Sequence, residues 1–596
     1  MKNEKRINLI ISTASTIILW ALVALCFDFF YELNDDILIK DIVAGIYTGI
    51  PEAHNNQMMY PISLLLSMIY KVFPKIAWFG LFEIAGFMVC FYMITYRMIA
   101  VMRKAYSKVI LAVVLILIWM GLYAWELSIM QYTVLAGTMC AAACVWLYLN
   151  EPTYDVKAML CKNIPAIVLV LIAFNIRSEM CLLMVPYMGI AAIGRMIDEE
   201  RVAGEGMHIN VKKVCAKYAS ICAVLAIGVL ITYIADIAAY SSDEWKNYRE
   251  VFDARTDVYD FTGIPPYDEN VSFYESIDVD INKYNLLCNY NYALDDSIDA
   301  DTLNAIAMYV HSGNASKAMG APKSIKTIVS QYVKDFVKLR MEDADISSPF
   351  ADDINQLMPF NIVIMLLYVS LILIAIVMKN KWLAIKVISA AIVRSVPWIY
   401  VYMKGRLVTR ITHPMLMCEV MLLLAILIYE CVKGTKVYLY LTLALLMGIS
   451  IINISGQYTN ICMKQEIRDN KNVLARQLSE YVSSNDGYFY VDVYSTVSMT
   501  ERVFDATLDK SRWQLAGGWM ACSPLDSEKR HLADVNEDMR QFNFISEEEN
   551  IAWLTEWYKS KYGKDAIVDI CDVIEGTNNE HLYVYRIGED NGTATT

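Results

Sequence analysis

Long apolar runs are the feature that most constrains what this chain can fold into. Runs of roughly 18 or more apolar residues recur along the first three quarters of the sequence, and each could cross a hydrocarbon core of about 30 Å. Hydrophobic residues make up 57% of the 596 residues, which is more than a soluble domain usually carries. We therefore expect a mainly α protein, a polytopic bundle of transmembrane helices.

Hydropathy predicts about eleven membrane spans. They lie near 7–29, 76–97, 108–128, 131–149, 164–177, 179–195, 217–238, 359–378, 382–402, 411–431 and 436–455. The first run follows a short basic segment and has no clear small-residue cleavage site. We therefore interpret it as the first span rather than as a signal peptide.

The positions of Lys and Arg predict the orientation of the bundle. Basic residues within 1–6, 97–108, 157–162, 195–217, 379–386 and 433–436 all fall on one side of the membrane. Cytoplasmic loops carry such an excess, so that side is predicted to be cytoplasmic. An odd number of spans then puts the N-terminus inside and the C-terminus outside a cell membrane that the chain crosses many times.

Two domains follow from this arrangement. Residues 1–455 form the transmembrane domain, which includes an extracytoplasmic loop at 239–358 with a helical pattern at 324–341. Residues 456–596 are predicted to form a small soluble α/β domain outside the membrane, because strand patterns occur at 488–494, 566–570 and 582–586. The net charge of −13 argues against a nucleic-acid partner.

Two adjacent carboxylates follow the first span. Asp35 and Asp36 lie in the first outward segment, directly before an amphipathic helix. A carboxylate there could act as a general base that takes a proton from an acceptor hydroxyl while the hydroxyl attacks a sugar carbon. The alternative is structural, since Asn34 or Asp35 could cap the helix and Asp36 could favour its N-terminal dipole.

A basic segment lies in the outward connection between the ninth and tenth spans. Arg406, Arg410 and His413 occur within ten residues there. Guanidinium groups match phosphate oxygens, and they would stabilise a lipid-phosphate leaving group during sugar transfer. The alternative is that these side chains reach anionic lipid headgroups at the membrane surface.

Two further arginines are expected near the outer face. Arg177 lies in a tight hairpin, where it points into a polar cavity or pairs with neighbouring Glu179. Arg394 lies deeper, and we expect Glu419 to be its partner in a buried ion pair.

The layout resembles the C-type multi-spanning glycosyltransferases of bacterial surface glycans, which use polyprenyl-phosphate sugars. The resemblance rests on Asn34-Asp35-Asp36 after the first span, on Tyr60-Pro61 before an apolar stretch, and on the basic segment 404–413. It implies that Asp35 or Asp36 serves as catalytic base or binds a divalent cation, and that Arg406 and Arg410 hold the lipid phosphate. The sequence itself shows no metal-ligand spacing and predicts no other cofactor.

The function that we expect is therefore transfer of a sugar from a polyprenyl-phosphate carrier to a glycan, lipid or protein acceptor at the outer membrane face. One alternative is a polysaccharide polymerase or ligase, in which Arg255 and His311 of the large loop would carry the chemistry. Another is a transporter or flippase of lipid-linked glycans, which would be expected to distribute charges along the depth of the spans.

Overall fold

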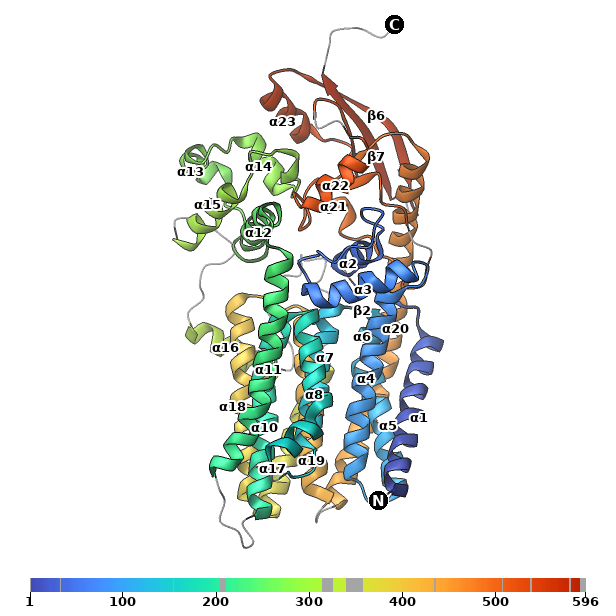
Figure 1. The fold of residues 1–596 in the computed structure, drawn as a ribbon, viewed down its shortest axis with the longest axis vertical. Coiled ribbons are helices and arrows are strands. Elements are labelled where there is room, and N and C mark those ends of the chain that lie inside the picture. Colours follow the sequence, from blue (N-terminus) through green and yellow to red (C-terminus); the bar gives the residue numbers. More distant parts are fainter. Residues whose placement is uncertain are drawn as a thin grey trace.

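The structure is a computed structural model, in which the residues described are 2–32, 34–153, 155–203, 211–313, 325–338, 357–432, 436–505, 508–535, 539–577 and 580–589. The chain is mainly helical (Figure 1). The molecule consists of a long helix bundle and an upper part. The N-terminus lies at one end of the bundle, and the upper part, which contains most of the non-helical structure, lies at the opposite end.

Among the described residues, ten helical segments are long and apolar enough to cross a membrane. They are α1 (Lys2–Cys26), α4 (Trp78–Val101), α5 (Ala105–Leu122), α8 (Val156–Ile176), α9 (Ser178–Leu183) together with α10 (Val185–Ala203), α11 (Val211–Ala239), α17 (Leu357–Val377), α18 (Lys381–Lys404), α19 (Thr409–Val432) and α20 (Lys436–Ser484). The predicted span at 131–149 is also a helix, α7 (Tyr132–Tyr148), but at 17 residues it is shorter than the others.

Helices α7 and α19 form the centre of the bundle. Nearly every side chain of both helices is buried, as expected for helices that are apolar on all sides. They pack closely because Gly137 faces Pro414, where a Cβ atom would lie only 2.5 Å from the proline side chain. Small residues at helix contacts allow such an approach within membranes.

The segment between α1 and α4 covers the upper end of the bundle (Figure 1). It contains β1 (Phe30–Tyr31), α2 (Asn34–Ala44) and α3 (Tyr60–Val72), and β1 pairs in parallel with β2 (Ile129–Met130), which follows α6 (Ala124–Ser128). Val503 of the C-terminal part also donates its backbone N–H to the Phe29 carbonyl at 2.9 Å. Backbone contacts among three distant parts of the sequence therefore fix the start of α2.

The loop after α11 folds into short helices above the bundle. They are α12 (Asp243–Thr256), η1 (Asp257–Thr262), η2 (Tyr267–Glu269), α13 (Val271–Ser276), α14 (Ile281–Cys288), η3 (Tyr292–Leu294), α15 (Ala300–His311) and the predicted helix α16 (Ile325–Lys338). Helix α16 lies beside α18, where the Tyr402 hydroxyl donates to Asp335 Oδ2 at 2.6 Å.

The C-terminal part contains a mixed five-stranded sheet in the order β4-β3-β5-β7-β6. Its strands are β3 (Phe489–Val491), β4 (Trp513–Leu515), β5 (Phe542–Ser546), β6 (Ala566–Glu575) and β7 (His581–Glu589), and its helices are α21 (Val493–Thr496), α22 (Pro524–Leu532) and α23 (Ala552–Tyr562). Strands β4, β3 and β5 are parallel, and β7 is antiparallel to β5 and β6. The three predicted strands therefore form, together with two that we had not predicted.

The structure joins regions that the sequence analysis separated. Helix α20 is 49 residues long and continues from the bundle into the C-terminal part, so the boundary predicted at 455 lies inside it. The loop after α11 and the C-terminal sheet also share one hydrophobic core, in which Leu286 and Tyr292 pack with Phe544 and Trp557. Loop residues from Ala254 to Ala307 thus pack with the C-terminal part, whereas Trp245 and Tyr332 of the same loop pack against the bundle.

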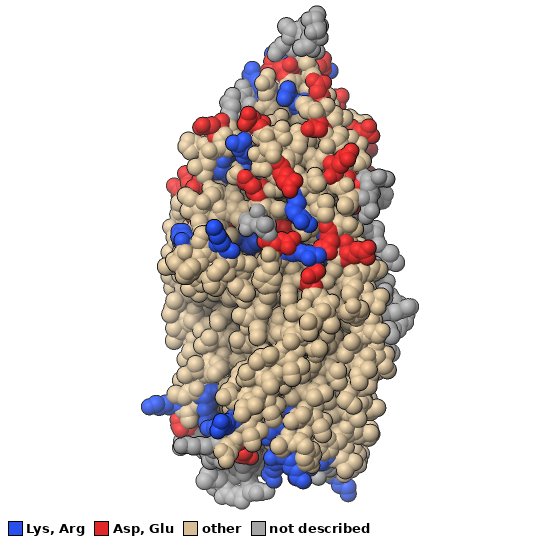
Figure 2. Space-filling model, turned by 90° about the vertical axis from the view of Figure 1, so that its right-hand side faces the viewer, with Lys and Arg blue, Asp and Glu red and all other residues tan. Residues whose placement is uncertain are grey.

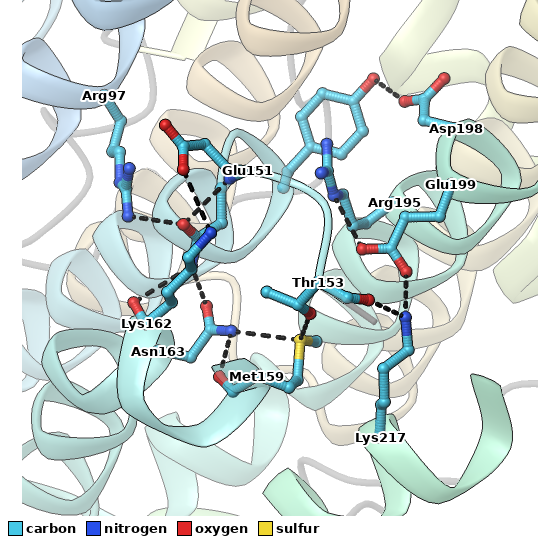
Figure 3. A network of polar contacts seen from close by, with 12 residues as sticks. Arg97, Glu151, Thr153, Met159, Lys162, Asn163, Arg195, Asp198, Glu199 and Lys217 are labelled. Carbon is cyan, nitrogen blue, oxygen red and sulfur yellow. Dashed lines mark hydrogen bonds and ion pairs between the residues drawn. The ribbon is translucent and has the colours of Figure 1, made fainter. Parts of the chain in front are cut away.

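A network of buried charges connects the helices at the other end of the bundle (Figure 3). Glu199 of α10 lies 3.5 Å from Arg195 Nε and 2.7 Å from Lys217 Nζ of α11. Next to it, Lys386 of α18 lies 2.8 Å from Asp198 Oδ1. Because these cations and carboxylates pair directly, they can remain charged out of water.

Candidate active site

A large cavity lies where the bundle meets the loop and the C-terminal part. Its volume is about 1210 Å³. Residues from α2, the α8–α9 connection, η1, the α18–α19 connection and the segment before α22 line it. It thus collects side chains from regions that are far apart in the sequence.

Four arginines from three regions line this cavity, and we call Arg177, Arg255, Arg406 and Arg410 the arginine cluster. Arg177 lies between α8 and α9, and Arg255 lies near the end of α12. Arg406 and Arg410 lie on either side of the start of α19. Gly405 ends α18 with a φ of 64°, a conformation that favours glycine, and so directs the chain back over the cavity.

The arginine cluster has few negative partners. Asp260 Oδ2 lies 3.5 Å from Arg406 Nη2 and 3.8 Å from Arg255 Nη1, so two arginines share one carboxylate. Arg410 has no hydrogen-bond or ion-pair partner among the residues that the structure describes.

The electrostatics of Arg406 show how closely the cluster is packed. Burial lowers the pKa of the Arg406 guanidinium, and Asp260 opposes this shift. The other three arginines lower the pKa further, because like charges repel one another. An anion bound among these side chains would relieve the repulsion, so the cluster is suited to a phosphate.

Arg177 does not pair with Glu179 alone. Its Nε lies 3.1 Å from Glu179 Oε2, as the hairpin interpretation predicted. Its Nη1 also donates to Gln57 Oε1 at 2.6 Å, and the guanidinium lies 5.8 Å from the centre of the Tyr132 ring. Both interpretations of Arg177 therefore hold, since the side chain pairs with Glu179 and also lines the cavity.

Asp35 lies in the same cavity as the arginine cluster. Its Oδ1 accepts a hydrogen bond from Trp519 Nε1 at 2.9 Å. Its negative charge acts on Arg177 and on Tyr290. A half-buried carboxylate that is held by one donor and borders a large cavity can accept a proton from a bound hydroxyl.

Asp36 has a different environment, although it is the next residue. Its side chain is fully buried, and Oδ1 accepts from the backbone N–H of Tyr132 at 2.9 Å. Burial raises the pKa of Asp36 well above the usual range, and the Tyr132 hydrogen bond only partly opposes this. Asp36 is not among the lining residues, so it connects α2 to α7 rather than facing a substrate.

His413 also lies away from the cavity. Its side chain is 1% exposed, and Nδ1 is paired with Glu126 within the bundle. The residue is one turn further along α19 than Arg410 and faces inward, because this part of α19 is buried. The structure therefore does not bring His413 together with the two arginines of its segment.

Of the remaining predicted residues, one lines the cavity and the others do not. Arg255, which the polymerase alternative invoked, joins the arginine cluster. His311 lies at the surface with Nε2 3.0 Å from Asp257 Oδ2 and is not among the lining residues. Arg394 pairs with Glu419 at 2.7 Å, which confirms the predicted ion pair.

Charges from the C-terminal part complete the cavity wall. Lys40 of α2 lies 2.8 Å from Asp41 and 2.5 Å from Glu501, and Lys510 reaches the same two carboxylates at 2.6 and 2.5 Å. Burial alone would raise the pKa of Glu501, but the two lysines outweigh it and lower the pKa to about 2. This four-residue group, the α2 clamp, attaches α2 to the C-terminal part.

Sequence reasoning missed Trp519, the donor to Asp35. The segment around it is held by the large loop, since Tyr292 and Tyr248 donate their hydroxyls to the carbonyls of Gly518 and Trp519 at 2.9 and 2.6 Å. A Cβ on Gly517 would meet the Tyr290 carbonyl oxygen at 1.8 Å, so only glycine fits there. The Gly517-Gly518-Trp519 sequence was the one visible signal.

Within the described part of the chain, no group of three or more His, Cys, Asp or Glu side chains is arranged to hold a metal ion. Comparison of the chain with protein-family models, with curated proteins and with solved structures finds no match.

Proposed function

We propose that this protein is a polytopic membrane glycosyltransferase that moves a sugar from a polyprenyl-phosphate carrier to an acceptor on the outer face of the cell membrane. The acceptor would be a glycan, a lipid or a protein. One observation carries the proposal: Asp35 and an arginine cluster with few negative partners line one cavity at the end of an apolar bundle.

The distribution of charge supports the proposed orientation. On the face shown in Figure 2, a belt without charged residues separates two charged zones, and Lys and Arg dominate the zone at the N-terminal end. The positive-inside rule would make that end cytoplasmic. The cavity, the large loop and the C-terminal part would then lie together on the extracytoplasmic side.

The cavity also has an apolar wall, which suits a lipid-linked donor. Side chains of α9, α10, α18, α19 and the α18–α19 connection contribute to this wall. They include Leu182, Leu183, Pro186, Val396, Leu407 and Ile411. A polyprenyl chain could lie against this wall while its phosphate contacts the arginine cluster, because apolar chains and phosphates need different surroundings.

The mechanism would be a single displacement. Asp35 would take the proton of the acceptor hydroxyl as the hydroxyl oxygen bonds to the anomeric carbon of the sugar. The bond from that carbon to the phosphate oxygen would break, and the electron pair would leave with the lipid phosphate. Arg406 and Arg410 would stabilise the negative charge that develops on the phosphate.

Binding of undecaprenyl phosphate tests the donor site. We expect the double variant Arg406→Gln/Arg410→Gln to bind the lipid roughly 10- to 100-fold more weakly than the wild type, because charge-assisted hydrogen bonds are lost. Native mass spectrometry of the protein in nanodiscs would measure the affinity. The controls are neutral undecaprenol and the variant Arg103→Gln, which changes an exposed arginine in the connection between α4 and α5 that is not among the lining residues. If the double variant Arg406→Gln/Arg410→Gln binds undecaprenyl phosphate as tightly as the control variant Arg103→Gln does, the proposal is contradicted.

Buried charges elsewhere in the bundle favour a transporter as the second candidate. Arg394 pairs with Glu419, and Lys386 pairs with Asp198 nearer the N-terminal end, so charge does occur at several depths. Each of these pairs is direct, however, as expected for static structural ion pairs. Movement of a fluorescent lipid-linked glycan across liposomes without any transfer product would favour the transporter.

A further inference from the structure

A second cavity of about 630 Å³ adjoins the first on the side of the C-terminal sheet. Tyr47 and Lys529 line both cavities, so these two residues form the partition between them. The wall of the second cavity contains several aromatic rings, namely those of Tyr47, Tyr488, Tyr490 and Phe542. Aromatic faces of this kind can pack against the apolar faces of sugar rings.

Lys529 is a buried cation that has no ion-pair partner among the described residues. It lies on α22 and is only 2% exposed. Its Nζ lies 4.2 Å from the centre of the Tyr47 ring and 5.8 Å from that of Trp513. Among the described residues, no side chain forms an ion pair or hydrogen bond with this Nζ. Contacts with aromatic faces offset only part of the cost of burying a cation, so an anionic ligand would stabilise Lys529.

The carboxylate that acts most strongly on Lys529 already has a partner. Asp526, one turn earlier on α22, accepts a hydrogen bond from the Tyr47 hydroxyl. Burial lowers the pKa of Lys529 to about 8, and Asp526 and Asp41 oppose the shift. At neutral pH the lysine therefore remains largely protonated, and it lines both cavities.

Lys529 is separate from the arginine cluster. The charges that act most strongly on it are those of Asp526, Asp41, Lys510 and Asp509, and none of these belongs to the cluster. The two cationic sites can therefore hold two different anions. If the arginine cluster holds the donor phosphate, the anion at Lys529 belongs to the other substrate.

We propose that Lys529 binds the carboxylate or phosphate of an anionic glycan acceptor that enters the first cavity through the second. This inference rests on the proposed glycosyl transfer, and it adds the chemical class of the acceptor and the residue that selects it. The aromatic rings would hold neutral parts of the glycan, and Lys529 would place an acidic group at the partition.

Protection of Lys529 from acetylation tests the proposal on the wild-type protein. The full chain in nanodiscs would react with a limiting amount of N-hydroxysuccinimidyl acetate, and mass spectrometry would follow each lysine. We expect glucuronate and glucose 6-phosphate to slow acetylation of Lys529 several-fold, whereas neutral glucose leaves it unchanged. Surface-exposed Lys246 is the internal control and should react equally under all conditions.

Three outcomes would overturn the proposal. Equal protection by glucose would show that charge does not matter. If inorganic phosphate protects Lys529 from acetylation but neither glucuronate nor glucose 6-phosphate does, Lys529 does not bind a glycan acceptor. Protection of Lys529 by undecaprenyl phosphate as strong as that by the sugar anions would assign the lysine to the donor instead.

Variants separate this inference from the proposed function. Lys529→Met should bind glucuronate roughly tenfold more weakly, as followed by saturation-transfer NMR, while Lys529→Arg retains binding. Both variants should bind undecaprenyl phosphate like the wild type. Unchanged glucuronate binding by Lys529→Met would refute the acceptor site alone. Unchanged binding of undecaprenyl phosphate by Arg406→Gln/Arg410→Gln would instead refute the proposed function.

Discussion

Adjacent residues can have unrelated roles when they lie on a helix between two environments. Successive residues of a helix point about 100° apart, so Asp35 and Asp36 of α2 face different neighbours. Asp35 borders the cavity and contacts Trp519, whereas Asp36 is buried against the start of α7. Neither of these hydrogen bonds goes to the backbone of α2, but both carboxylates lie in its first turn, where negative charge favours the helix dipole as the structural alternative predicted.

The two carboxylates should therefore respond differently to the same substitution. We expect Asp35→Asn to reduce sugar transfer roughly 10²- to 10⁴-fold, since an amide cannot accept the proton. Asp36→Asn should change transfer by less than about threefold, because burial already favours the neutral form of Asp36 and the amide oxygen can still accept from Tyr132. Initial rates with polyprenyl-phosphate sugars would measure both effects, and equal losses would contradict the assignment.

At the scale of single elements, α2 depends on partners that are distant in the sequence. Its first turn follows β1, which pairs with β2, and its middle is held by the α2 clamp. The segment that carries Asp35 is only 11 residues long, and isolated helices of that length are marginal in water. Its position in the cavity wall is therefore set by the C-terminal part.

The α2 clamp should make stability depend on pH in the acidic range. The pKa of Glu501 is about 2 in the folded protein and about 4.3 in an unfolded chain. A carboxylate whose pKa is lowered by folding stabilises the protein above the unfolded value, and this contribution is lost as pH falls from about 4.3 toward 2. We expect Glu501→Gln to lower the unfolding temperature at neutral pH, with a difference from the wild type that shrinks at acidic pH.

Thermal unfolding in detergent across this pH range would test the clamp. Glu556→Gln, an exposed residue of α23, is the matched control and should have little effect. A Glu501→Gln deficit that stays constant down to acidic pH would mean that the clamp does not contribute through charge.

At the scale of the whole molecule, the large loop and the C-terminal part act as one body above the bundle. They share a hydrophobic core, and Trp557 Nε1 donates to Asp295 Oδ2 of the loop at 2.8 Å. This body holds Trp519 against Asp35 and contributes Arg255 to the arginine cluster. The cavity is thus complete only when the bundle and the upper body are together.

Damage to the shared core should spread across both regions. Trp557→Ala removes a side chain that is 1% exposed, and we expect it to destabilise the upper body by about 3–5 kcal/mol. Limited proteolysis with mass-spectrometric mapping should then find faster cleavage in residues 243–311 as well as in the C-terminal part. Glu556→Ala is the control on the same helix, and cleavage confined to the C-terminal part would contradict a shared core.

The helices of the bundle and many of the charges at their ends can be predicted from the sequence alone. Apolar runs must form helices to satisfy their backbone groups away from water, and this requirement is local to each run. Arg406, Arg410 and Arg177 could be found for the same reason, because charges beside such runs are conspicuous. The strand patterns of the C-terminal part were visible as well, since alternation of residues is also local.

Only the tertiary structure decided which of these side chains meet. It placed Asp35, and not Asp36 or His413, beside the arginines, and it supplied Arg255, Trp519 and Lys529 from segments whose composition is unremarkable. It also joined the loop to the C-terminal sheet through a core that no single segment reveals. The physical reason is that burial and charge pairing between distant segments depend on packing geometry, whereas the preference of an apolar run for a helix does not.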